Sequence, residues 1–114
     1  MRKLLALAVL LSILPRPANA MLISEFRSHP EEQQKVYALG AVSMLAFSEG
    51  MRGNEKRMNC ISAWYGAKGE GALFEALKLS PDNFKRIFRF SPDDETVAHV
   101  ELLIIRLAND ACPA

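Results

Sequence analysis

The sequence predicts an all-α protein, a small single-domain bundle of four to five helices with one disulfide. Three observations lead to this prediction. Apolar residues recur at the three- and four-residue spacing of a helix through most of the chain. No segment alternates between apolar and polar residues for long, as a half-buried strand would. Two Ser-Pro-Asp sequences are typical of helix starts, and no stretch rich in Gly, Pro or Ser is long enough to be a linker.

The first twenty residues are typical of a secretory signal peptide. A basic start precedes an apolar run, Leu4–Leu14, and the small-x-small pattern that signal peptidase reads stands at Ala18-Asn19-Ala20. The apolar run is too short to cross a bilayer, which needs about 20 residues. We therefore predict that residues 1–20 are removed and that residues 21–114 form a periplasmic or secreted helical domain without a stable membrane anchor.

The charge of the predicted mature chain gives no support for binding to nucleic acid or to anionic membranes. Residues 1–20 hold three of the 14 Lys and Arg residues and none of the 13 Asp and Glu residues. The remaining 11 basic and 13 acidic residues give a net charge of −2, whereas nucleic-acid-binding domains are typically basic. A domain of this size buries a modest part of its surface and gains from a covalent cross-link.

The two cysteines, Cys60 and Cys112, are predicted to form that cross-link. Export favours the pairing of thiols, and two cysteines allow one intramolecular connectivity. The disulfide would close a loop of about 50 residues, worth roughly 4 kcal/mol in the chain-entropy model. The alternatives are a metal pair, a catalytic thiol or two free thiols. However, two cysteines without a local histidine make a poor zinc site, and neither His29 nor His99 has a visible link to a cysteine.

A long helix is predicted to begin after Ser28. This serine can cap the helix, Glu31 is a capping-box partner, and Pro30 suits the first turn. From Val36 to Phe47 only one residue is polar. Such a helix lies at the centre of a bundle or shows an apolar face to a partner, and we favour the central position.

The middle of the chain is predicted to hold a loop, a short helix and a turn. Residues 51–59 are polar and charged and predict the loop. The short helix carries Trp64 and Tyr65, which are expected to be core residues rather than a ligand-stacking pair. The glycine-rich sequence at 66–72 reads as a turn into the next helix. It does not match the G-x-x-x-x-G-K-[ST] pattern of a phosphate-binding loop, and no strand is predicted before it.

Two further helices are predicted to start at Ser-Pro-Asp sequences, where Ser80 and Ser91 would be the caps. The last helix would run from Pro92 to about Asn109. Its buried face would consist of Val97, Val100, Leu103, Ile104 and Leu107. The polar side would carry His99 and Arg106. A solvated surface explains this pair better than a small anion site.

No catalytic, cofactor-binding or metal-ligating residue is assigned. The chain lacks the H-E-x-x-H, G-x-S-x-G and C-x-x-C motifs, and its acidic pairs stand where helices begin, which the helix dipole explains. We therefore predict a binding protein that is not an enzyme and needs no cofactor.

Residues 36–113 resemble the Rap/Tai-type immunity proteins, which neutralise cell-wall amidases delivered by type VI secretion. Members often combine a signal peptide, a tyrosine-x-x-glycine in the first long helix, a mid-chain cysteine and a terminal helix that runs into a cysteine beside a proline. The counterparts here are Tyr37–Gly40, Asn59-Cys60-Ile61 and the segment from Pro92 to Cys112-Pro113. The resemblance implies a helical bundle with one disulfide that blocks a peptidoglycan amidase effector by stoichiometric binding.

Two other functions fit the same features. An acid-stress periplasmic chaperone of the HdeA type would also be small, exported, helical and joined by one disulfide. A structural or envelope-assembly subunit would form a constitutive complex. The sequence does not identify the partner-binding residues, and it leaves open whether the chain forms a homodimer.

Overall fold

The computed structural model describes residues 20–113, and these residues are organised as five helical rods without a strand. The all-α fold class and the single disulfide are thereby confirmed. All of the predicted signal peptide except Ala20 lies outside the described residues. The rods are α2 (Ile23–Ser28), α3 (Glu31–Met51), a continuous rod of α4 (Glu55–Trp64), η1 (Tyr65–Gly69) and α5 (Glu70–Leu77), then α6 (Pro81–Phe88) and α7 (Val100–Ala111).

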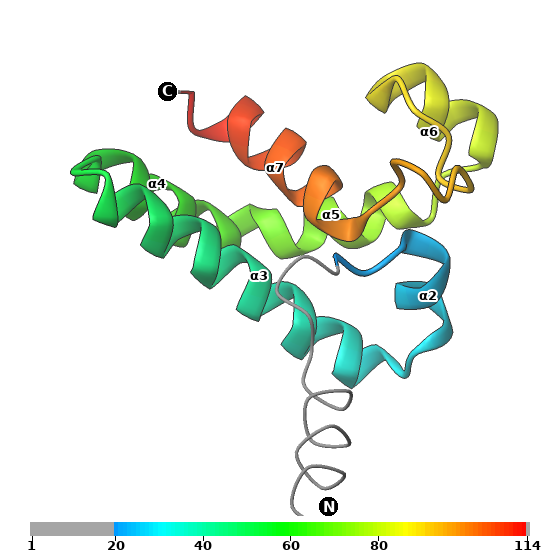
Figure 1. Ribbon diagram of the computed structural model, residues 1–114, viewed down its shortest axis with the longest axis horizontal. Coiled ribbons are helices and arrows are strands. Elements are labelled where there is room, and N and C mark those ends of the chain that lie inside the picture. Colours follow the sequence, from blue (N-terminus) through cyan, green and yellow to red (C-terminus); the bar gives the residue numbers. More distant parts are fainter. Residues whose placement is uncertain (1–19, 114) are drawn as a thin grey trace, which may run out of the picture.

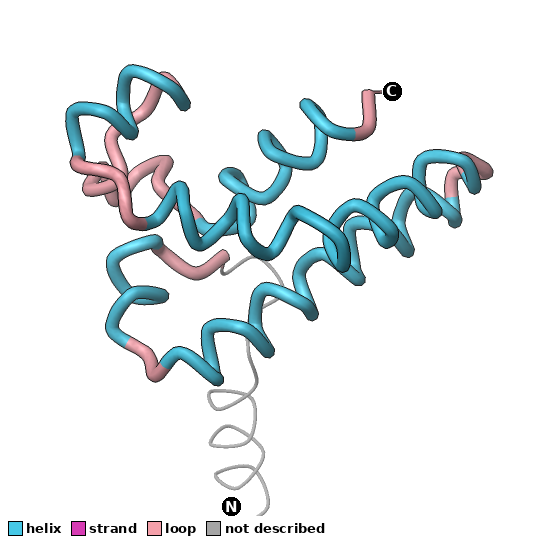
Figure 2. Tube along the Cα trace, turned by 180° about the vertical axis from the view of Figure 1, so that it is seen from behind, coloured by secondary structure: helices cyan, strands magenta, loops and turns pink. Residues whose placement is uncertain are grey.

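Helices α3 and α4 form a long antiparallel hairpin, which is seen from both sides in Figures 1 and 2. The chain reverses over only a few residues because Gly53 adopts a positive φ of 85°. Asn54 then caps α4, and its side chain accepts a hydrogen bond from the Arg57 backbone N–H at 3.2 Å. The prediction of a loop over 51–59 was therefore wrong, because the capped helix begins at Glu55.

The capping box predicted for the long helix was also wrong. Ser28 is the last residue of α2, and its hydroxyl donates to the Glu25 carbonyl at 2.6 Å. The long helix nevertheless begins at Glu31, as the first-turn residues indicated, with Pro30 in the cap position. Local bonding within α2 thus competes with the cap that the sequence suggested.

The glycine-rich segment is not a turn, because α4 continues through a π-helical stretch into α5. The Glu70 N–H bonds to the Tyr65 carbonyl, five residues back. At Gly69 a Cβ atom would lie 2.9 Å from the Trp64 ring, so the indole packs where a side chain would otherwise be. Tyr65 is buried and Trp64 is half-buried against the core, as expected for core residues.

One of the two Ser-Pro-Asp sequences starts a helix and the other does not. Ser80 accepts a hydrogen bond from the Asn83 N–H at 3.3 Å, and α6 follows with Pro81 in its first position. After Ser91, by contrast, the side chain of Asp94 accepts bonds from the backbone and hydroxyl of Thr96 and holds a turn. The prediction that the last helix begins at Pro92 was wrong, since α7 begins at Val100.

The core lies where the first described residues, α3, the α4–α5 rod and α7 meet (Figure 1). The backbone of Met21–Ile23 runs beside the residues that lead into α7: Val100 N–H donates to the Met21 carbonyl at 2.9 Å and Ile23 N–H to the Ala98 carbonyl at 2.8 Å. The buried hydrophobic residues are Ile23, Phe26, Ala38, Val42, Ala46, Ile61, Tyr65, Leu73, Ala76, Phe84, Phe88, Ala98, Val100, Leu103, Ile104, Ala108 and Cys112.

Candidate functional site

One side of α3 exposes a row of large apolar side chains. Their exposed fractions run from 56% to 75%. Most of them follow the three- and four-residue steps that place residues on one face of a helix. We call this surface the outer face of α3; its large residues are Val36, Leu39, Met44, Phe47 and Met51.

The outer face corrects the prediction that this helix is central. Ala38, Val42, Ala46 and Glu49 occupy the opposite, buried side. The helix is apolar on both sides, so its sequence period could not distinguish the side that packs inward from the side that is solvated. One apolar side of this helix is therefore exposed in the described part of the chain, and the other is buried.

Small residues separate the large ones in the middle of the outer face. Gly40 and Ser43 are exposed there, and a Cβ atom at Gly40 would meet nothing within 4 Å. Side chains at the centre of the outer face therefore project little from the helix, and another chain could approach the α3 backbone closely there. A hollow lined by His29, Gln33 and Tyr37, among others, adjoins the face at Val36.

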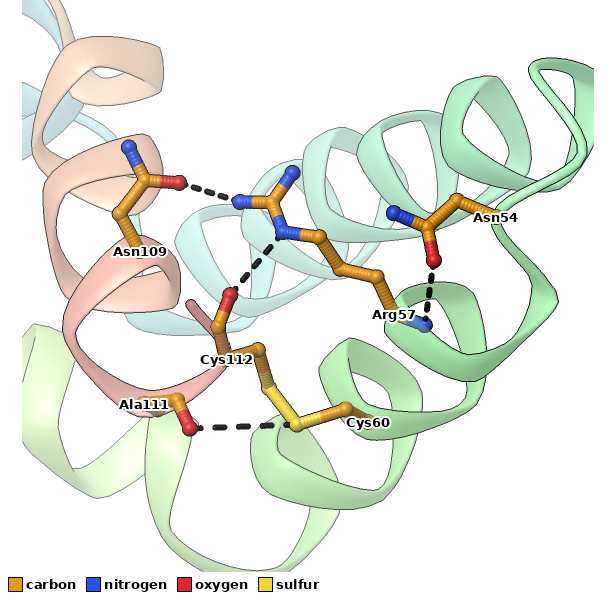
Figure 3. Close-up of a disulfide and its surroundings, with 6 residues drawn as sticks. All are labelled: Asn54, Arg57, Cys60, Asn109, Ala111 and Cys112. Atoms are coloured by element: carbon orange, nitrogen blue, oxygen red, sulfur yellow. Dashed lines mark hydrogen bonds between the residues drawn. A yellow bond between two sulfur atoms is a disulfide. The ribbon is translucent and has the colours of Figure 1, made fainter. Parts of the chain in front are cut away.

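The disulfide and one arginine hold together the part of the molecule where the end of α3, the start of α4 and the end of α7 meet (Figure 3). We call this part the hairpin end. Cys60 of α4 is bonded to Cys112, with their Cα atoms 5.9 Å apart. Arg57 points from α4 toward the end of α7, where Nε donates to the Cys112 carbonyl at 3.0 Å and Nη2 donates to the Asn109 side chain.

The same arginine forms a buried ion pair with α3. Arg57 Nη1 lies 2.6 Å from Glu49 Oε1, and the two side chains are 11% and 7% exposed. Glu49 is the one buried charged residue in the described part of the chain. Arg57 therefore joins the ends of α3, α4 and α7. The sequence interpretation did not single out this pair. The available signal was an acid on an apolar helix, followed across a short turn by a basic residue.

A second polar cluster joins Met21 to α3 and α7. Tyr37 donates a hydrogen bond to Glu101 Oε1, and the backbone N–H of Met21 donates to Tyr37 Oη at 3.3 Å. Burial, and then the hydrogen bond to Glu101, raise the pKa of Tyr37 to about 12. Glu101 Oε2 is buried and accepts no hydrogen bond from any described residue.

His99 and Arg106 do not form the shared polar face that the sequence predicted. His99 precedes α7 and is half-buried, because its backbone bridges to Leu22. Its Nδ1 is buried without a partner among the described residues. Arg106 is exposed on α7. Of the predicted buried face, Val97 precedes α7 and is partly exposed, whereas Val100, Leu103 and Ile104 are buried as predicted.

Residues 20–113 contain no group of three or more His, Cys, Asp or Glu side chains placed to hold a metal ion. Within this range no helix combines the length and apolar character needed to cross a bilayer. Neither a protein-family model, nor a curated protein, nor a solved structure matches this chain.

Proposed function

We propose that this protein is an exported immunity protein, which binds a cell-wall amidase toxin stoichiometrically through the outer face of α3. The observation that carries the proposal is the row of exposed apolar side chains on one helix. Large apolar patches on small proteins typically mark interaction sites. The resemblance of residues 36–113 to amidase immunity proteins supplies the class of the partner.

The size of the outer face suits a protein partner. A helix of 21 residues is about 30 Å long, and a standard interface buries about 800 Å² on each side. Full burial of one large apolar side chain contributes about 1.5–3 kcal/mol. Transfer of Phe47 and its neighbours from water into an interface therefore provides the main driving force for binding.

The network at the hairpin end supports the same function through rigidity. The disulfide and Arg57 tie α4 and α7 together, and the Glu49–Arg57 pair ties α3 to both. A surface that is already ordered loses less conformational entropy on binding. In this proposal the disulfide has a structural role without redox chemistry, and inhibition needs no catalytic group in this chain.

The test compares two apolar-to-charged substitutions in co-expression with a secreted amidase encoded beside this gene. Phe47→Glu places a charge on the outer face. Ile87→Glu is the matched control, because Ile87 is a similarly exposed apolar residue on α6. We expect the wild type and Ile87→Glu to relieve lysis in proportion to their amount, and Phe47→Glu to lose both relief and co-purification with the amidase. Far-UV circular dichroism and thermal melts check that both variants fold.

Other outcomes assign other functions. If Phe47→Glu protects as well as Ile87→Glu does, the outer face is not the contact surface. If the wild type neither relieves lysis nor co-purifies with an exported protein, yet suppresses aggregation of unrelated proteins at about pH 2–3, where protein carboxylates are protonated, the acid-chaperone function replaces immunity. Self-association through the outer face would appear in sedimentation as a dimer that Phe47→Glu dissociates.

A further inference from the structure

The predicted cleavage site lies beside the half-buried carboxylate of Glu101, one oxygen of which is buried and has no hydrogen-bond donor among the described residues. Met21, the first residue of the predicted mature chain, donates its backbone N–H to Tyr37 Oη at 3.3 Å. Tyr37 in turn donates to Glu101 Oε1, which leaves Oε2 of the same carboxylate buried without a partner among the described residues. A buried carboxylate oxygen without a donor is costly, so a site of this kind favours an additional cation or N–H group.

The backbone around Met21 is held in place independently of its own N–H. The Met21 carbonyl accepts from Val100 N–H, and the next residues bridge to Ala98 and His99. These bonds fix residues 21–23 along the start of α7. A new chain terminus at Met21 would therefore form at the position where the Met21 nitrogen already points toward Tyr37.

Cleavage changes the chemistry of that nitrogen. Hydrolysis by signal peptidase breaks the bond between the Ala20 carbonyl carbon and the Met21 nitrogen. The oxygen of water joins the Ala20 carbon to give a carboxylate, and the two protons of that water end on the Met21 nitrogen. The ordinary pKa of an α-amino group is about 7.7–8.0, so at neutral pH the product is mainly an ammonium with three N–H donors. The amide offered a single N–H and no charge.

We propose that cleavage after Ala20 creates an α-ammonium group at Met21 that pairs with Glu101, directly and through Tyr37, and so locks the start of the mature chain onto α3 and α7. This inference rests on the proposed export of the protein. The sequence motif for processing and the folded domain are thereby linked, because the processed end becomes a structural element of the core.

The surrounding groups favour a cation at this position. Glu101 faces it from α7, the Tyr37 hydroxyl faces it from α3, and Glu25 of α2 contributes a further negative charge to the environment of Tyr37. Two histidines and a further carboxylate lie near this position. His99 bridges to Leu22 through its backbone, and His29 and Glu32 line the same hollow as Met21 and Tyr37. Because the pKa of Tyr37 is about 12, its phenol stays protonated and can accept from the ammonium while donating to Glu101.

The test is a double-mutant cycle on protein that is exported and purified from the periplasm. One arm is the natural sequence, which is expected to begin at Met21. In the other arm one alanine is inserted between Ala20 and Met21, so cleavage after Ala20 leaves the amine one residue away, about 3.8 Å along the chain. Glu101→Gln and Tyr37→Phe are made in both arms, and intact mass verifies each N-terminus.

We expect Glu101→Gln to reduce the folding equilibrium constant by about tenfold more in the natural arm than in the extended arm, as for a hydrogen bond to a charged group. Tyr37→Phe should also reduce the folding equilibrium constant more in the natural arm than in the extended arm. This second variant keeps the test decisive if Glu101→Gln does not fold. Equal losses in the two arms would overturn the inference, as would a natural arm that begins at another residue.

The pH dependence gives a second readout. A carboxylate partner raises the pKa of the amine above about 8 in the folded chain, so the added stability is complete below that pH and is lost as pH rises through the raised value. NMR titration of the Met21 amine should show this raised pKa in the wild type and its return to the ordinary range in Glu101→Gln. Failure of these results leaves amidase binding through Phe47 untouched, whereas failure of export appears directly in the mass.

Discussion

At the scale of single residues, Arg57 is the group on which most of the hairpin end depends. Its guanidinium bonds to side chains or carbonyls of α3, α7 and the C-terminal segment. Few other side chains could do this, because a planar guanidinium offers five N–H donors in a fixed geometry. The consequence is that one substitution affects three helix ends together.

Replacement of Arg57 by alanine should cost about 3–5 kcal/mol of unfolding free energy, because it removes the close, buried partner of Glu49. The buried carboxylate then keeps the longer contact with the exposed Arg52, at 3.8 Å. The control is Lys35→Ala, which breaks the exposed Lys35–Glu31 pair and should cost less than about 1 kcal/mol. Urea denaturation of both variants measures the difference. Similar losses for the two would mean that the Glu49–Arg57 pair is solvated in solution.

At the scale of the elements, the π-helical segment explains how α4 and α5 form one rod. Gly69 lies against the Trp64 ring, so the backbone can approach the indole only without a side chain at this position. The neighbouring glycines of the same sequence have no such contact: a Cβ atom at Gly66 or Gly71 would meet nothing within 4 Å. Of these three glycines, only Gly69 is required by close packing against another side chain.

Gly69→Ala should destabilise the fold by about 1–3 kcal/mol, because the added methyl group overlaps the Trp64 ring and forces it to move. Gly71→Ala is the matched control within α5. It should be neutral or stabilise by about 0.5–1 kcal/mol, since alanine loses less backbone entropy than glycine in a helix. Thermal or urea unfolding decides the matter. A stabilised Gly69→Ala would argue against close packing of the indole on this glycine.

The two sides of α7 provide another comparison at this scale. Leu103 is fully buried and Arg106 is exposed. Leu103→Ala should cost about 2–5 kcal/mol because it leaves a cavity, whereas Arg106→Ala should change the unfolding free energy by less than about 0.5 kcal/mol. Denaturation midpoints test both. Equal losses would show that the faces of α7 are assigned wrongly.

At the scale of the whole molecule, the disulfide joins the middle of the chain to its end across 52 residues. It is a covalent link between α4 and the residues after α7, and Arg57 of α4 adds a hydrogen bond to the Cys112 carbonyl. A cross-link of this span removes many conformations from the unfolded chain. The small core of a domain of this size therefore gains a large part of its stability from one bond.

The double variant Cys60→Ala and Cys112→Ala should lose about 2–5 kcal/mol of unfolding free energy. Under the proposed function, in which the disulfide acts through rigidity, protection against the amidase should fall with the folded population. It should return in a stabilised variant that lacks both cysteines. Intact mass after alkylation without reduction provides a direct check. Two alkylated thiols in native protein from the periplasm would contradict the disulfide.

The helical class, the cysteine pairing and the start of α6 could be predicted from the amino-acid sequence. Each of these depends on information that is local or has a single solution: apolar spacing within one segment, two cysteines with one connectivity, and a Ser80 cap beside Pro81. Local capping chemistry was not always decisive, however. Ser91 precedes the same Pro-Asp sequence as Ser80, yet no helix starts there. The backbone N–H of Thr96 donates to the Asp94 side chain in a turn, and the backbone at His99 bridges to Leu22.

Three features depend on long-range packing and could not be predicted from sequence: which side of α3 is buried, the continuation of α4 into α5, and the pairing of Glu49 with Arg57. A helix that is apolar all round packs by whichever side its neighbours cover, and no period within the helix records that choice. The candidate binding surface could therefore not be predicted from sequence. Phe47 and Val42 are both apolar residues of α3, and contacts with other helices determine that Val42 is buried while Phe47 is exposed. Local residue patterns predicted the helices, whereas long-range packing determined the surface that those helices present.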